Sequence, residues 1–206
     1  MNGQYKAFWL DENKDVVVID QTKLPFEYET IALKTADDSI WSIKDMIVRG
    51  AGVIGNIAAF GIYLAVKENT DMTYIRKKAQ EIRESRPTAV NLMWAVDLMM
   101  EKLENTQEDL LQTALNEAIK ITDGDVERSA MIGKYGCDKF EELMAQNGKT
   151  SINVLTHCNA GWLAIVDDGS ALAPIYEAQR RGIDIHVWVD ETRPRNQGAN
   201  LTAWEL

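Results

Sequence analysis

The hydrophobic period of the chain changes at Asn147-Gly148-Lys149. Over residues 39–147, apolar side chains recur every three or four positions, which predicts amphipathic helices. Residues 151–156 then alternate between apolar and polar side chains, as in a β-strand, and the glycine marks the boundary. We therefore predict two domains, residues 1–147 and residues 148–206.

The first domain is predicted to be mainly helical with a small β-sheet at its start. Residues 5–10 and 16–20 are short β-prone runs on either side of a polar segment, which predicts a hairpin, and Leu24-Pro25 closes that unit. Helical spacing follows around Ile40 to Ile47 and over residues 53–65, 72–84, 88–103 and 107–121, with breaks at Arg49-Gly50-Ala51-Gly52, Arg86-Pro87 and Asn105-Thr106.

The second domain is predicted to begin with a β-α-β unit. A strand over 151–156, an amphipathic helix over 170–181 that stops at Gly182, and a strand over 183–189 give two parallel strands with a right-handed crossover. Residues 197–206 begin another helix. The fold class is therefore α/β, with the first β-α-β of a Rossmann-like doubly wound domain. Because such sheets are buried on both faces, we expect the sheet to continue in a longer chain or in a second chain.

Charge and cysteine content narrow the function classes. The net charge of −10 repels polyanions, so we expect no nucleic-acid groove. Two cysteines are too few for a disulfide framework and fit a reducing compartment, so a cytoplasmic protein is expected. No export signal is recognisable at the start. The most apolar stretch, residues 47–66, is interrupted by Arg49, Gly50, Gly52, Gly55 and Asn56, so no membrane span is predicted.

Two polar segments follow the predicted strands, His157-Cys158-Asn159-Ala160-Gly161 and residues 190–198. Ligands of open α/β sheets bind beyond the carboxyl ends of the strands, so both segments are expected to face one crevice. The alternative is that His157 and Asn159 satisfy backbone groups of a turn while Cys158 fills an apolar gap. Cys137 is predicted to be core packing. We expect no metal, because the adjacent His157-Cys158 cannot by itself make a tetrahedral site.

The segment Arg49-Gly50-Ala51-Gly52 opens a predicted helix. Free N–H groups at a helix start, together with a guanidinium, suit a phosphate. Gly52 and Gly55 could equally permit close helix packing. Arg86-Pro87-Thr88 supplies a second guanidinium before another helix, with Thr88 as the expected helix-start residue, and by itself it is an ordinary turn.

Taken together and in order, these segments resemble the methylthioribose-1-phosphate isomerase family. The segments that carry the resemblance are Asp45-Met46-Ile47-Val48-Arg49-Gly50-Ala51 with Ile54-Gly55, Arg86-Pro87-Thr88-Ala89-Val90-Asn91-Leu92, Thr156-His157-Cys158-Asn159-Ala160-Gly161, and Asp190-Glu191-Thr192-Arg193-Pro194-Arg195 continuing through Gln197-Gly198-Ala199 to Leu201-Thr202-Ala203-Trp204-Glu205-Leu206. The wider superfamily includes ribose-1,5-bisphosphate isomerases and the alpha, beta and delta regulatory subunits of the translation-initiation nucleotide exchange factor.

The resemblance implies an aldose-ketose isomerase of methionine salvage, which converts 5-methylthioribose 1-phosphate to 5-methylthioribulose 1-phosphate without a metal or organic cofactor, as a homodimer. It implies that Cys158 lies at the reacting carbons. A downstream aspartate of the family, the proton donor, has no counterpart in these residues, so the chain resembles the N-terminal portion. The residues that the resemblance assigns to the substrate, largely to its phosphate, are Arg49, Gly50, Ala51, Arg86 and Gln197.

Three alternatives stay open at this point. The substrate could be 5-deoxyribose 1-phosphate, because nothing in these residues fixes the substituent at C5. The chain could belong to a regulatory subunit that senses a nucleotide or sugar phosphate without turnover, although a thiol beside a phosphate pocket argues against a pure scaffold. It could also be an inactive fragment. Gly52-Val53 departs from the Pro-Ala pair frequent in the family, which should change loop stiffness more than chemistry.

Overall fold

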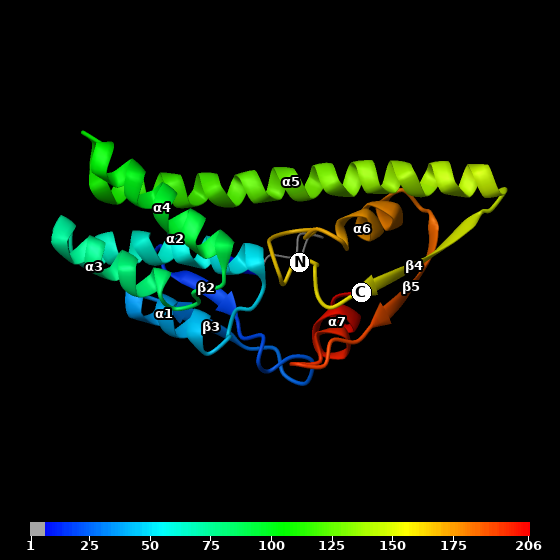
Figure 1. Ribbon diagram of the computed structural model, residues 1–206, viewed down its shortest axis with the longest axis horizontal. Coiled ribbons are helices and arrows are strands. Elements are labelled where there is room, and N and C mark those ends of the chain that lie inside the picture. Colours follow the sequence, from blue (N-terminus) through cyan, green and yellow to red (C-terminus); the bar gives the residue numbers. More distant parts are fainter. Residues whose placement is uncertain (1–6) are drawn as a thin grey trace. The chain divides into compact units, whose positions relative to one another are not determined.

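The computed structural model describes residues 7–206, which divide into two compact units (Figure 1). The helical unit contains residues 8–23 and 27–124, and the α/β unit contains residues 125–206 with residues 24–26. The helix α5 (Leu110–Asn147) begins in the first unit and ends in the second. The contacts thus divide the chain near residue 124, inside a continuous helix, whereas a domain boundary at residue 147 stays a prediction.

The helical unit starts with a three-stranded antiparallel sheet. Its strands β1 (Phe8–Leu10), β2 (Val16–Ile19) and β3 (Thr30–Leu33) lie in that order, with Trp9 opposite Val17 and Val17 opposite Ala32. The hairpin prediction is confirmed over these residues, while residues 5 and 6 lie outside the described part. The expectation that the unit closes at Leu24-Pro25 is wrong, because β3 returns to pair with β2 after an irregular ten-residue connection that carries no strand pattern.

Four of the predicted helices form within this unit, and the fifth is the start of α5. They are α1 (Ala36–Lys44), α2 (Ala51–Glu68), α3 (Met72–Arg83) and α4 (Val90–Asn105). Thr35 and Asp38 form a capping box at the start of α1, and Asp71 caps α3. The helical spacing that extended to Ile47 overshoots, because α1 ends at Lys44 and Met46 adopts a φ of 62°.

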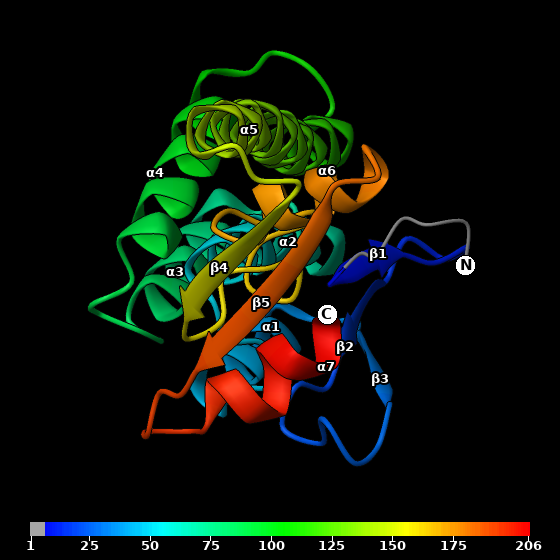
Figure 2. The same ribbon diagram turned by 90° about the vertical axis from the view of Figure 1, so that its right-hand side faces the viewer.

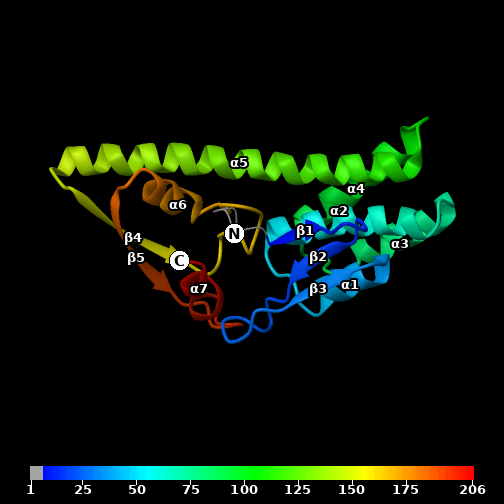
Figure 3. The same ribbon diagram turned by 180° about the vertical axis from the view of Figure 1, so that it is seen from behind.

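The core helix of this unit is α2, around which α1, α3 and α4 pack (Figure 3). By length and composition α2 is the one helix among residues 7–206 that would be able to cross a membrane, but 83% of it is buried inside the protein. Burial on all sides is what a central helix of a bundle requires. We therefore interpret α2 as a core helix.

The α/β unit contains the predicted β-α-β arrangement. Strands β4 (Ser151–His157) and β5 (Asp184–Asp190) pair in parallel from Ser151–Asp184 to His157–Asp190, and helix α6 (Ala173–Arg180) connects them (Figure 2). The helix begins three residues later than predicted because residues 161–172 form turns, and Pro174 occupies its first turn. Gly182, with a φ of 73°, ends it as expected.

The chain after β5 forms a short π-helix η1 (Gly198–Thr202) that continues into α7 (Ala203–Glu205). Single π-helical turns are frequent at functional sites. A helix was predicted here from residue 197, and its π-helical first turn was not predicted.

One face of the β4–β5 pair is exposed. Leu155 and Trp188 lie opposite each other in the register and are 70% and 58% exposed. The Trp188 indole N–H donates to the Asn153 side-chain oxygen at 3.1 Å. Parallel sheets are normally buried on both faces, and the expectation that a longer chain or a second chain continues this sheet stays a prediction.

The second half of α5 packs against α6. A Cβ on Gly136 would lie 2.3 Å from the Pro174 ring, so the helices are in close contact there. Arg181 then joins them through Asp138 and Glu141 on α5, at 2.7 and 2.9 Å, and through Glu177 on α6. Cys137 is fully buried in this region, so the core-packing prediction is confirmed. Burial raises the pKa of the Cys137 thiol.

A buried lysine joins two helices of the helical unit and provides a first prediction. Lys78 on α3 donates to Asp37 on α1 at 2.7 Å and to Glu81 at 2.9 Å, and its side chain is only 10% exposed. We expect Lys78→Ala to lower the free energy of unfolding in urea by about 1–2 kcal/mol, because two charge-assisted bonds are lost. Lys77→Ala is the matched control, since Lys77 is 72% exposed and 3.8 Å from Glu81. Equal effects of the two variants would contradict the prediction.

Candidate functional site

The carboxyl ends of β4 and β5 meet at one edge of the sheet. His157 and Asp190 are the last residues of the strands and lie opposite each other in the register. His157 Nδ1 and Asp190 Oδ2 are 3.0 Å apart, and this hydrogen bond lowers the pKa of Asp190 below its usual range. The two polar segments predicted to share this edge therefore do so.

Cys158 follows β4 in a strained backbone conformation. Its φ is 66°, in the left-handed region that non-glycine residues rarely adopt. Its carbonyl accepts a hydrogen bond from the Thr202 hydroxyl at 2.5 Å, and the same hydroxyl accepts one from the Asn159 amide at 3.1 Å. Residues held in such conformations cluster at functional sites, where the surroundings fix them. Here the fixing group is Thr202 on η1.

The turn after Cys158 is formed by two glycines in close contact. Gly169 has a φ of 78°, and a Cβ there would lie 2.3–2.5 Å from the backbone of Gly161. Ser170 N–H donates to the Ala160 carbonyl at 2.9 Å and completes the reversal of the chain. No larger residue than glycine fits at position 169, so the path of the chain from Cys158 to α6 depends on this contact.

A carboxylic acid lies beneath the same turn. Glu205 Oε1 accepts the Leu163 N–H at 2.7 Å, and its Oε2 is buried. Burial raises the pKa of Glu205 to about 7, although the Leu163 N–H, Asn159 and Tyr176 act in the opposite direction. Burial also raises the pKa of Tyr176, and the Glu205 charge adds to that effect. This polar cluster was not predicted, because it depends on contacts between distant residues.

Glu191 occupies the start of η1. Its carboxylate accepts the N–H groups of Gly198 at 2.8 Å, Ala199 at 3.1 Å and Thr192 at 2.8 Å. Desolvation opposes ionisation, but these N–H groups outweigh it, so the pKa of Glu191 lies below its usual range. Gln197 precedes this turn, and its Oε1 is buried without a hydrogen-bond partner among the described residues.

In the helical unit, α2 and α4 contact each other near their starts. A Cβ on Gly55 would lie 3.1 Å from the Asn91 carbonyl oxygen, so the alternative reading of the glycines, close helix packing, is correct at Gly55. The N-caps of the two helices are Gly50 and Ala89, and neither makes a side-chain capping bond. The expectation that Thr88 starts the second helix is wrong, because it lies one residue before the N-cap. Both helices thus begin without a side-chain acceptor for their free N–H groups.

An arginine lies shortly before each of these helices. Arg49 is half-buried and donates through Nη2 to the Gln21 carbonyl at 3.1 Å. Arg86 is also half-buried, and its Nη1 is buried without a hydrogen-bond partner in residues 7–206. A buried guanidinium N–H without a protein acceptor is suited to an anion, and so are the free N–H groups of an uncapped helix start.

The predicted site residues therefore fall into two sets. Arg49, Gly50, Ala51 and Arg86 belong to the helical unit, at or shortly before the starts of α2 and α4. Cys158 and Gln197 belong to the α/β unit, beyond its strands. Within the described chain, no three His, Cys, Asp or Glu side chains are grouped so as to hold a metal ion.

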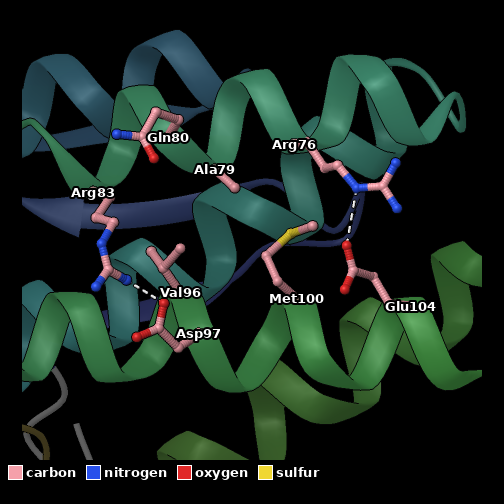
Figure 4. A pocket seen from close by; sticks show the side chains of 8 residues that line it. All are labelled: Arg76, Ala79, Gln80, Arg83, Val96, Asp97, Met100 and Glu104. Carbon is pink, nitrogen blue, oxygen red and sulfur yellow. Dashed lines mark hydrogen bonds and ion pairs between the residues drawn. The ribbon is translucent and has the colours of Figure 1, made fainter.

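A surface groove between α3 and α4 is separate from these residues (Figure 4). Ion pairs of Arg83 with Asp97 and of Arg76 with Glu104 bridge it on either side of Met100. Its arginines are neutralised by carboxylates, and none of the predicted site residues lines it. We do not assign a ligand to this groove.

Comparison with known proteins identifies the family. Residues 47–206 match the Initiation factor 2 subunit family. The chain belongs to this family. It is 57% identical, over its whole length, to methylthioribose-1-phosphate isomerase of Sulfurimonas denitrificans.

Two solved structures share the fold. One is the delta subunit of translation initiation factor eIF-2B from A. fulgidus, with a TM-score of 0.82, 35% identity and 98% of this chain covered. The other is 5-methylthioribose 1-phosphate isomerase from Pyrococcus horikoshii, with a TM-score of 0.86, 33% identity and 97% covered. The predicted fold class is confirmed by these neighbours. The chain spans 58% of the length of the Sulfurimonas relative, and 58% and 56% of the two solved chains.

The contact between Gly161 and Gly169 provides the second prediction. We expect Gly169→Ala to lower the free energy of unfolding by about 3 kcal/mol, because a positive φ and a backbone clash both oppose the new methyl group. Gly182→Ala is the matched control: Gly182 has a similar φ of 73° but open space around it, so only about 1 kcal/mol is expected. Urea denaturation of both variants measures the difference, and equal losses would show that the clash is relieved by local movement.

Proposed function

We propose that this chain is part of an isomerase that converts 5-methylthioribose 1-phosphate to 5-methylthioribulose 1-phosphate. The observation that carries the proposal is the 57% identity over the whole chain to a relative bearing that name. The chemistry of the site residues is compatible with it. We propose the substrate, the site of its phosphate and the roles of individual residues together.

The uncapped starts of α2 and α4 are the proposed phosphate site. Gly50 and Ala51 offer backbone N–H groups, and Arg49 and Arg86 offer guanidinium groups. The start of η1 is a poorer candidate, because the Glu191 carboxylate already accepts its N–H groups and would repel a second anion. Gln197 is therefore proposed to bind hydroxyl groups of the sugar instead of the phosphate.

The reaction itself explains why an acid and a base are needed. A sugar phosphorylated at its anomeric oxygen has no free aldehyde, so its ring must open first. A proton is delivered to the ring oxygen, hydrogen moves from C2 to C1, and the C2 hydroxyl gives up its proton to leave a ketone. Every atom of the substrate is retained, so the step requires no external oxidant or reductant. A metal or organic cofactor is not part of the proposal.

Cys158 is proposed to act at C1 and C2. As thiolate or thiol, it stabilises or deprotonates the opened intermediate, and the hydrogen bond from Thr202 holds its strained backbone, with a φ of 66°, in place. The resemblance assigns the proton delivered to the ring oxygen to an aspartate that has no counterpart in these residues. We further propose that the working protein is a cytoplasmic homodimer, as the resemblance implies.

A regulatory function is the alternative from another class. The eIF-2B delta subunit of A. fulgidus has nearly the same fold, so the fold alone does not separate a catalyst from a regulatory subunit. Isomerisation of 5-deoxyribose 1-phosphate is a second alternative, and it differs only in the substituent at C5. Turnover assays with both sugar phosphates distinguish the three.

The third prediction tests catalysis in the natural gene product that contains this chain. With 5-methylthioribose 1-phosphate, we expect Cys158→Ser to lower kcat by about 100-fold or more with little change in KM, because the thiol acts on the reacting carbons. Ketose formation is the measurement. A Cys158→Ser variant with near-wild-type turnover would contradict the role of Cys158, and a wild-type protein that binds the sugar phosphate without turnover would favour the regulatory alternative.

The fourth prediction tests the phosphate site in the same assay. We expect Arg86→Met to raise KM by about tenfold or more, because a charge-assisted hydrogen bond to the phosphate is lost. Arg83→Met is the matched control, since Arg83 is paired with Asp97 in the groove of Figure 4. An unchanged KM in Arg86→Met would place the phosphate elsewhere.

A further inference from the structure

The turn that carries Cys158 is held at two points by the segment after β5. Thr202 donates to the Cys158 carbonyl at 2.5 Å, and Glu205 accepts the Leu163 N–H at 2.7 Å. Thr202 and Glu205 are three positions apart, which is about one helical turn, so both face the same side. The ring of Trp162 in this turn and the ring of Trp204 in α7 also contact each other, with centroids 5.7 Å apart.

The Glu205 carboxyl is enclosed by the turn. A Cβ on Gly161 would lie 1.8 Å from Oε2, so only glycine leaves room for the carboxyl at this place. Oε2 is buried and makes no hydrogen bond of regular geometry among the described residues, and the Asn159 and Tyr176 side chains are the polar groups that act on the carboxyl. The two carboxyl oxygens are both acceptors when Glu205 is ionised, whereas a protonated carboxyl supplies a donor. An enclosed, partly unsatisfied carboxylate is costly to keep charged.

We propose that Glu205 is a positioning residue for Cys158, which holds the turn of residues 158–163 in place when its carboxyl is protonated and loosens it when the proton is lost. The proposal takes the catalytic importance of Cys158 from the proposed function, but the contact between Glu205 and the turn stands on the geometry alone. Glu205 touches the turn from its inner side, and its effect on the thiol is indirect.

The charged groups around this turn determine how the turn responds to pH. Burial raises the pKa of Glu205 to about 7, so its charge changes near neutral pH. Tyr176 on α6 faces the carboxyl, and Asp168 acts on Tyr176. The His157–Asp190 pair adjoins Cys158 on the strand side, and Glu191 binds the start of η1. Below neutral pH Glu205 is neutral and the turn is closed, and above it the buried charge favours an open turn.

Alkylation of Cys158 by iodoacetamide tests the proposal without requiring turnover. The rate is measured between about pH 5.5 and pH 8.5 by peptide mass spectrometry, which separates Cys158 from the buried Cys137. The wild-type rate is divided by the Glu205→Gln rate at each pH. This ratio removes the effect of thiol ionisation on the rate, which is common to both proteins. We expect a ratio near one at low pH that rises about threefold or more in a step near pH 7, because only the wild type acquires the buried charge.

Histidine ordinarily titrates near neutrality, so His157→Gln is the matched control. The step must persist when the ratio is measured in the His157→Gln background. A flat ratio, or a step that disappears with His157, would overturn the proposal. Such results would not contradict the proposed isomerase function. Conversely, an absence of isomerase activity would not change the alkylation ratio.

Tyr176→Phe keeps the proposal testable even where Glu205→Gln does not fold. The Tyr176 hydroxyl lowers the pKa of Glu205, so its removal is expected to move the step in the alkylation profile to higher pH. The wild type and Tyr176→Phe are then compared directly, by the pH at which each profile departs from the slope of simple thiol ionisation. An unchanged position of the step would contradict the proposed coupling.

Discussion

The parallel register of β4 and β5 is the constraint on which the α/β unit depends. Pairing of Ser151 with Asp184 fixes the pairing of His157 with Asp190 six residues later, and so places both following segments at one edge. If one strand slipped by one residue against the other, its side chains would turn to the opposite face of the sheet. Val154 or Val187 would then take the exposed position that Leu155 or Trp188 now occupies. The hydrogen bond between His157 and Asp190, and the return of η1 beneath Cys158, require this register.

The elements with regular periods could be predicted from the sequence, because local pattern determines them. The β-α-β order, the parallel pairing and the stop at Gly182 all follow from alternation, length and one glycine. Strand β3 was missed because four residues, Thr30–Leu33, carry too short a pattern and depend on β2 for pairing. The full length of α5 was also missed, since its middle is polar and interrupted by glycines that pack against α6.

The candidate site was predictable as a set of positions but not as an arrangement. Arg49, Arg86, Cys158 and Gln197 were named from motifs, and the structure places them at helix starts and beyond strand ends. The contacts that hold these segments involve Thr202, Glu205 and Glu191, which lie 44, 42 and 7 residues from their partners Cys158, Leu163 and Gly198. No local pattern carries such pairings. Glu205 had a polar position in a helix and nothing in the sequence marked it as buried.

An acidic protein that binds an anion needs local positive charge that its own carboxylates have not neutralised. The net charge of −10 disfavours an anion at long range. Arg76, Arg83, Arg180 and Arg181 are each paired with Asp or Glu and offer little to a phosphate. Arg86 instead keeps a buried Nη1 without a hydrogen-bond partner in the described chain, and it precedes α4, whose N-cap carries no side-chain acceptor. A buried donor of this kind costs stability unless a ligand satisfies it, so the composition that argues against polyanions is compatible with one small phosphate at this place.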